Sequence, residues 1–155
     1  MNCQHKRKDI ELGMELRLPY DKLSAGAYKG LYSTYAQVGN RWLGKALFEL
    51  INMRVSQING CAYCMERHAK ALRSEKETEE RIDTLAGWRL SPHLTDRERA
   101  ALAWADAVTI ITENQAPDEL FLTLKQHFSD VEISDLILAI SILNVLNRLA
   151  TSMRR

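Results

Sequence analysis

The chain has 155 residues, of which 46% are hydrophobic and 26% are charged, with 21 basic and 20 acidic residues and a formal net charge of +1 at pH 7. A chain of this length and composition can bury a hydrophobic core as one globular domain without disulfide bonds. A net charge this close to zero gives no strong overall attraction to nucleic acid. We therefore expect a single domain over residues 1–155 that has no nucleic-acid partner.

The sequence also shows neither the pattern of a secretory signal nor that of a membrane span. The first 17 residues are rich in charge and lack the apolar segment of a secretory signal. The most apolar stretch, around residues 136–145, is interrupted by Ser141 and Asn144, so it falls short of the roughly 18 apolar residues that span a membrane. We expect a cytoplasmic protein without a membrane partner.

The first half of the chain has the periodicity of helices. Residues 1 to about 20 have no clear pattern and are expected to form an irregular arm. Apolar side chains then recur every three or four residues over 23–38, as on one face of a helix. Residues 42–58 carry a broader apolar stripe that is typical of a core helix, with Glu49 in its middle. Asn59-Gly60 is a turn signal, and it predicts that a new helix begins near Cys61.

The second half continues in the same way. A further helix is expected over 78–86 and another over 117–128, where Pro117 fits the first helical position. Thr95 to Glu98 and Ser129 to Glu132 both have the capping-box pattern, and they predict helices that reach about residues 111 and 149. The last helix is apolar on more than one face, so it should be buried centrally or against another subunit. Because no alternating strand pattern competes, we predict an all-α fold.

The most informative stretch surrounds a Cys-x-x-Cys motif. Steps of three and four residues keep Cys61, Cys64 and His68 on one face of a helix. Unpaired backbone N–H groups at the start of that helix favour a thiolate. In a reducing compartment, such a pair indicates redox or metal chemistry, whereas Cys3 is expected to be a bystander.

Three chemistries use this cysteine spacing. Attachment of haem requires histidine directly after the second cysteine, and Met65 occupies that position. A zinc site could combine Cys61, Cys64 and His68 with Glu49, but no second pair of ligands at metal spacing follows. Redox chemistry is therefore favoured, although a zinc-binding or structural interaction module remains the alternative.

A redox site makes two demands that the spacing can meet. One thiol must ionise readily, and Cys64 has His68 one turn further along the helix. A second thiol must reach the oxidised sulfur, and Cα atoms three residues apart in a helix are about 5 Å apart, within disulfide range. Spacing alone favours a solvent-facing Glu49, because a buried carboxylate needs a partner.

These residues resemble a known family. The segment from Glu49 through Arg54 to Cys64 and His68, with the pattern Glu-x11-Cys-x2-Cys-x3-His, is similar to the core of the alkylhydroperoxidase D-like branch of the carboxymuconolactone decarboxylase family. Residues 96–105 and 144–148 extend the resemblance toward the C-terminus. The resemblance implies a helical fold that assembles into trimers or hexamers, and a thiol peroxidase activity with an antioxidant role.

The resemblance also implies a role for each site residue. Cys64 corresponds to the peroxidatic cysteine and Cys61 to the resolving cysteine, with His68 and Glu49 as the proton relay that activates them. Tyr63 stands where the best-studied members have a histidine; it could donate a hydrogen bond but could not act as a base near neutral pH. The expected partners are a hydroperoxide and an external dithiol reductant, lipoyl- or thioredoxin-like, with no cofactor. A general dithiol oxidoreductase with little peroxidase activity is a further alternative.

Overall fold

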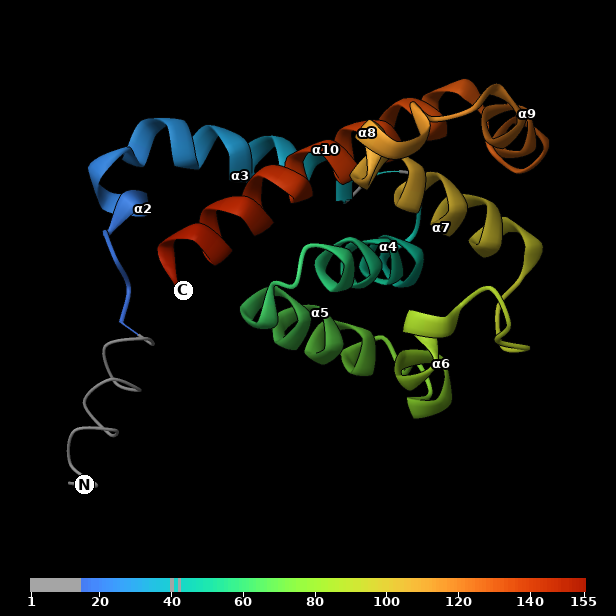
Figure 1. Ribbon diagram of the computed structural model, residues 1–155, viewed down its shortest axis with the longest axis horizontal. Coiled ribbons are helices and arrows are strands. Elements are labelled where there is room, and N and C mark those ends of the chain that lie inside the picture. Colours follow the sequence, from blue (N-terminus) through green and yellow to red (C-terminus); the bar gives the residue numbers. More distant parts are fainter. Residues whose placement is uncertain (1–14, 40, 42) are drawn as a thin grey trace.

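The computed structural model describes residues 15–39, 41 and 43–155. All regular secondary structure in these residues is helical, which confirms the predicted all-α class (Figure 1). Cys3 and Trp42 lie outside the described residues. The helices, with the labels of Figure 1, are α2 (Tyr20–Leu23), α3 (Ala25–Gly39), α4 (Lys45–Ile58), α5 (Ala62–Ser74), α6 (Glu79–Asp83), the 3₁₀ turn η1 (Leu85–Gly87), α7 (Asp96–Thr109), α8 (Ile111–Asn114), α9 (Asp118–His127) and α10 (Asp130–Met153).

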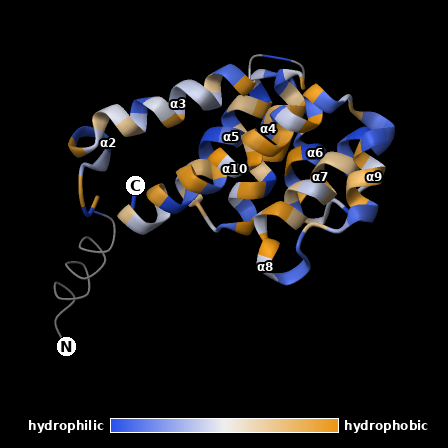
Figure 2. Cartoon of the chain, turned by 90° about the horizontal axis from the view of Figure 1, so that it is seen from above, coloured by the Kyte–Doolittle hydropathy of each residue, from blue (hydrophilic) through white to orange (hydrophobic). Residues whose placement is uncertain are grey.

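Helix α4 forms the centre of the molecule. It packs against α5, α7 and α10, and its side chains Leu50, Ile51 and Val55 are fully buried. Figure 2 shows the most hydrophobic residues gathered on α4 and on the helices around it. Burial of each of these large aliphatic side chains contributes about 1.5–3 kcal/mol to stability.

Helix α10 runs beside α3, α4 and α7 and combines a buried face with an exposed one. It is long and apolar enough to cross a membrane by length and composition, but half of its most hydropathic stretch is buried inside the protein. Asp135, Asn144 and Asn147 are also buried on it. These properties are those of a core helix of a folded domain, and they match the predicted burial of the last helix.

Helix α3 extends along α10, and the short helix α2 packs against α3 at one end of the molecule (Figure 1). Just before α2, the backbone N–H of Arg17 donates to the carbonyl of Met153 at 2.9 Å, and its guanidinium donates to the carbonyl of Ser152 at 3.1 Å. The start of the described chain is therefore fastened to the end of α10. Most of the predicted irregular arm, residues 1–14, lies outside the described residues.

Three predicted helices are shorter than expected, and the helix predicted over 42–58 begins only at Lys45. The segment 78–86 divides into α6 and the turn η1. At the residue between them, Thr84, the side-chain hydroxyl donates to the carbonyl of Glu80 at 2.6 Å. The predicted helix over 95–111 ends at Thr109, and Ile110 leaves helical geometry with φ −108° and ψ 46°. Residues 108–112 are all β-branched, and such side chains lose rotamer freedom in a helix.

The predicted helix starts are largely confirmed. Both capping boxes form, with Thr95 bonded to Glu98 and Ser129 bonded to Glu132 in the reciprocal way that the sequence predicts. Pro117 differs by one position: its ψ of 145° places it at the N-cap, and α9 begins at Asp118.

Candidate active site

The two motif cysteines lie where a tight turn enters α5. Gly60 has φ 65°, a left-handed conformation that side chains rarely adopt, and it directs the chain into the helix. Cys61 is the N-cap of α5, and its sulfur accepts the backbone N–H of Cys64 at 3.3 Å. The two Cα atoms are 5.2 Å apart and the sulfurs form a disulfide. The predicted dithiol pair at a helix N-terminus is therefore present, with Cys61 just outside the helix.

A network of side-chain amides holds this turn against α10. The Asn59 side-chain amide donates to Asn144 Oδ1 at 2.9 Å and to Asn147 Oδ1 at 3.1 Å. Asn147 in turn donates to the hydroxyl of Ser56 on α4 at 3.3 Å. These bonds join α4, the turn and α10, so they fix where the cysteines lie relative to the core.

Glu49 and His68 form a hydrogen-bonded pair between α4 and α5. His68 Nδ1 lies 2.7 Å from Glu49 Oε2, and the two side chains are only 11% and 13% exposed. The interpretation from spacing, that Glu49 faces solvent, is wrong, because α5 packs along α4 and supplies a partner in the interior. When Nδ1 carries the proton toward Glu49, Nε2 is free to accept another proton.

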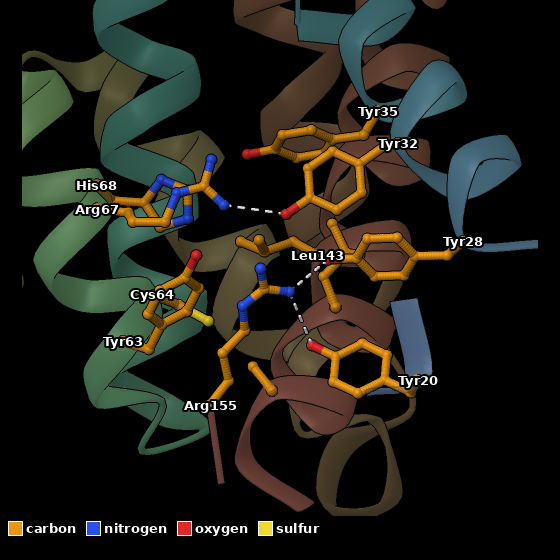
Figure 3. A pocket seen from close by; sticks show the side chains of 12 residues that line it. Tyr20, Tyr28, Tyr32, Tyr35, Tyr63, Cys64, Arg67, His68, Leu143 and Arg155 are labelled. Atoms are coloured by element: carbon orange, nitrogen blue, oxygen red, sulfur yellow. Dashed lines mark hydrogen bonds between the residues drawn. The ribbon is translucent and has the colours of Figure 1, made fainter. Parts of the chain in front are cut away.

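Cys64 and His68 both line a pocket between α5, α10 and the N-terminal helices (Figure 3). Cys61 is not part of the lining; it is buried against Ala150 and Tyr63. A small molecule in the pocket can therefore contact Cys64 but not Cys61.

The chain has five tyrosines, and all of them line this pocket. Tyr63 comes from α5, whereas the other four follow one face of α2 and α3 and contact each other ring to ring: Tyr20, Tyr28, Tyr32 and Tyr35. Figure 3 shows these rings facing Cys64 and His68 across the pocket.

Two arginines complete the polar part of the lining. Arg67 donates to the Tyr32 hydroxyl at 3.0 Å, and Arg155 donates to the hydroxyls of Tyr28 and Tyr20 at 3.1 and 3.3 Å. The Arg155 guanidinium also lies 5.2 Å from the centre of the Tyr63 ring, within cation–π range.

These contacts separate the acidities of the phenols. Burial raises the pKa of Tyr28 and Tyr35 above the usual phenol value. Burial also acts to raise the pKa of Tyr32, but hydrogen bonds from Tyr28 and Arg67, together with the charges of Arg67 and Arg155, outweigh it and lower that pKa. Tyr32 is thus the most acidic of these three phenols.

Sequence reasoning found the cysteines, His68, Glu49 and Tyr63, but it missed the wall of the pocket opposite them. A signal was present, because Tyr28, Tyr32 and Tyr35 recur at steps of four and three, but an aromatic stripe in a helix predicts core packing equally well. Arg155 has no local signal, since only the fold brings it to α5.

The zinc alternative gains no support from the donor geometry. Among residues 15–39, 41 and 43–155, no group of three or more His, Cys, Asp or Glu side chains is arranged to hold a metal ion. Glu49 and His68 bond to each other, and both cysteine sulfurs are used in the disulfide.

The protein is thus a helical protein with a redox-capable Cys-x-x-Cys pair at the start of α5 and a carboxylate–imidazole pair between α4 and α5. The sequence profile of the carboxymuconolactone decarboxylase family matches residues 27–107. The chain belongs to this family, and its relatives place it in the AhpD-like branch that the motif predicts.

Three relatives illustrate the range of similarity. An uncharacterized protein of Bacillus subtilis, YdfG, is 31% identical over 140 residues, which cover 90% of this chain and 95% of that protein. The alkyl hydroperoxide reductase AhpD of Rhodococcus erythropolis is 43% identical over 56 residues, or 36% of this chain and 28% of that enzyme. A solved structure from Agrobacterium tumefaciens, a protein of unknown function proposed to be the antioxidant defence protein AhpD, is 41% identical with a TM-score of 0.87 and covers 90% of this chain and 96% of that one.

Proposed function

We propose that the protein is a thiol-dependent peroxidase that reduces hydroperoxides through a dithiol–disulfide cycle of Cys61 and Cys64. The observation that carries the proposal is the placement of Cys64 in the pocket beside His68, with Cys61 behind it at bonding distance. The similarity to AhpD supports the same reaction, as a match to part of that enzyme.

The first step oxidises Cys64. His68, oriented by Glu49 through the 2.7 Å hydrogen bond, takes the thiol proton. The thiolate attacks the terminal, hydrogen-bearing oxygen of the peroxide, the O–O bond breaks, and the proton passes from His68 to the departing alkoxide, which leaves as an alcohol. Cys64 is then a sulfenic acid.

The second step forms the disulfide. The Cys61 thiol attacks the sulfenic sulfur of Cys64, a water molecule leaves, and the 61–64 disulfide results. An external dithiol, lipoyl- or thioredoxin-like, then exchanges with this disulfide and restores both thiols. Tyr63 is proposed as an auxiliary hydrogen-bond donor, since its ring lines the pocket beside Cys64.

We extend the proposal to location and assembly. A cytoplasmic setting would supply the reducing dithiol. Self-association, as trimers or hexamers, is supported by three apolar residues spaced seven apart on the exposed face of α10: Val131, Leu138 and Val145, which are 50%, 44% and 40% exposed.

The test is a steady-state assay of hydroperoxide consumption with dithiothreitol, lipoamide or thioredoxin as the reductant. The proposal expects turnover with at least one of these donors and slower turnover on a small disulfide such as 5,5′-dithiobis(2-nitrobenzoate). Faster turnover on the disulfide would favour a general dithiol oxidoreductase. Stoichiometric zinc in protein purified without chelator, together with no peroxide turnover, would favour the zinc-binding alternative.

A further inference from the structure

The pocket beside Cys64 has an excess of positive charge. Arg67 and Arg155 both line it, and the hydrogen bonds described for them go to neutral phenols. Within the described part of the chain, the only carboxylate within ion-pair distance of either guanidinium is Asp21, at 3.9 Å from Arg155. Glu49 is nearby but is already bonded to His68. An anion in the pocket would therefore meet two guanidinium groups that have donors to spare.

Apart from the arginines, His68 and the phenol hydroxyls, the pocket is lined by apolar groups, and its two walls differ. The side formed by α2 and α3 is a row of tyrosine rings, and the side formed by α10 consists of Leu143, Leu146 and Ala150. Ring faces and edges pack well against another aromatic ring, while the aliphatic side accepts either of its faces. In chemical character, such walls favour contact with a flat, apolar body over contact with a small polar molecule such as hydrogen peroxide.

From these two features we infer that the pocket binds an aromatic carboxylate, and that the hydroperoxide reduced at Cys64 is an aromatic one bearing a carboxylate group. The carboxylate pairs with Arg67 and Arg155, the ring lies against the tyrosines, and the peroxide group reaches Cys64. This inference rests on the proposed peroxidase function for its second half, whereas the binding of the carboxylate stands without it. The product is the corresponding alcohol.

The shape of the site supports this orientation. Figure 3 shows the Arg155 guanidinium between Tyr20 and Tyr28 on one side and Tyr63 and Cys64 on the other, and Arg67 pointing toward Tyr32. Both arginines donate hydrogen bonds to phenol hydroxyls, and a carboxylate oxygen could take the place of a hydroxyl as the acceptor. Because a carboxylate is charged, each exchanged hydrogen bond would become the stronger, charge-assisted kind.

The binding test uses a matched pair of unreactive ligands, 4-isopropylbenzoate and its neutral isostere 4-isopropylbenzamide, titrated calorimetrically into the oxidised protein. We expect the acid to bind at least ten-fold more tightly than the amide at low salt, with the preference shrinking as salt is added. Arg67→Gln and Arg155→Gln should each weaken binding of the acid at least three-fold and leave binding of the amide unchanged. Arg73→Gln, on the same helix but paired with Glu79, is the control and should change neither.

Equal binding of acid and amide to the wild-type protein would overturn the inference without relying on any variant. Binding of octanoate as tightly as the aromatic acid would overturn its aromatic part.

The reaction test compares cumene hydroperoxide with its 4-carboxy derivative as substrates. We expect kcat/KM to be at least ten-fold higher for the carboxylated peroxide, and Arg67→Gln to remove this preference. Turnover of both peroxides at equal kcat/KM would refute the substrate class and leave the peroxidase function intact. Tight binding of 4-isopropylbenzoate with no turnover of either peroxide would instead refute the proposed function and keep the binding site.

Discussion

At the scale of single residues, the chemistry depends on groups that the fold places in different environments. Cys64 lines the pocket, while Cys61 is buried outside the lining. This difference supports the division of roles between an attacking and a resolving thiol. The Glu49–His68 hydrogen bond fixes the orientation of the imidazole, as a carboxylate does for the base in other nucleophilic sites.

Removing the Glu49 carboxylate should slow the reaction without unfolding the protein. In Glu49→Gln, the amide can still accept a hydrogen bond from His68 but no longer stabilises the imidazolium that forms when Cys64 ionises. We expect kcat/KM for the peroxide to fall by about 10²-fold, within the range typical of general acid–base groups. Glu66→Gln, an exposed carboxylate paired with Lys70 on α5, is the control and should retain full activity. An unchanged kcat/KM in Glu49→Gln would remove Glu49 from the relay.

The tyrosine cluster should titrate in a defined order. Because the pKa of Tyr32 is lowered by Tyr28 and the two arginines against the effect of burial, absorbance at 295 nm should show its phenolate at lower pH than those of Tyr28 and Tyr35. Tyr32→Phe should remove this step at lower pH, whereas Tyr35→Phe should remove one at higher pH, since burial raises the pKa of Tyr35.

The lowered pKa of Tyr32 also makes the free energy of unfolding depend on pH. Between the lowered pKa of folded Tyr32 and the unfolded value of about 10, the unfolded chain holds more protons. The free energy of unfolding should therefore rise with pH across this window relative to Tyr32→Phe, and a fall would contradict the assignment.

At the scale of the elements, the helices were largely predictable because their signals are local. The capping boxes at Thr95 and Ser129 and the periodicity of α4 and α10 determine structure within a few residues of themselves. The break at Ile110 could have been read from the run of β-branched residues, but residues 78–86 gave no comparably clear signal. The helix N-terminus at Cys61 followed from the Asn59-Gly60 turn.

Contacts between distant elements were not predictable in the same way. The hydrogen bonds of Asn59 with Asn144 and Asn147 join residues more than 80 positions apart. The bonds from Arg155 to the tyrosines of α2 and α3 depend likewise on how the two ends of the chain meet. No local pattern determines such contacts. For Glu49, the resemblance to a family supplied the information that periodicity lacked.

Two glycines of α3, Gly30 and Gly39, should respond to substitution in opposite directions. A Cβ at Gly39 would lie 2.7 Å from a ring carbon of Phe48, which is buried, whereas a Cβ at Gly30 would meet nothing within 4 Å. Gly39→Ala should therefore destabilise the protein by about 1–3 kcal/mol through overpacking. Gly30→Ala should stabilise it by up to about 1 kcal/mol, because alanine is the better helix former. Urea denaturation measures both, and equal effects would contradict the packing of α3 on α4.

At the scale of the whole molecule, the pocket is built from both ends of the chain and its middle. Tyr20 and Tyr28 come from the N-terminal helices, Cys64 and His68 from α5, and Arg155 from the residues after α10. The exposed apolar face of α10 lies outside this pocket, so assembly through that face and chemistry in the pocket are separable.

A substitution on that face should change assembly and spare the site. Leu138 is 44% exposed and lies midway between Val131 and Val145, so Leu138→Glu would place a charge in the proposed interface. Light scattering with size-exclusion chromatography should give a mass near three or six times 17.7 kDa for the wild type and a smaller mass for the variant. Leu122→Glu, the same change at a 61% exposed leucine of α9 outside that face, is the control and should keep the wild-type mass. A wild-type mass of one chain would contradict the proposed assembly.

The most direct test of the central claim is to trap the oxidised sulfur. Reduced wild-type, Cys61→Ser and Cys64→Ser proteins are treated with one equivalent of hydroperoxide in the presence of dimedone and analysed by peptide mass spectrometry. We predict the 61–64 disulfide in the wild type, a dimedone adduct on Cys64 in Cys61→Ser, and no rapid peroxide consumption by Cys64→Ser. Rapid consumption by Cys64→Ser, with the adduct on Cys61, would contradict the assignment of Cys64 as the residue that attacks the peroxide.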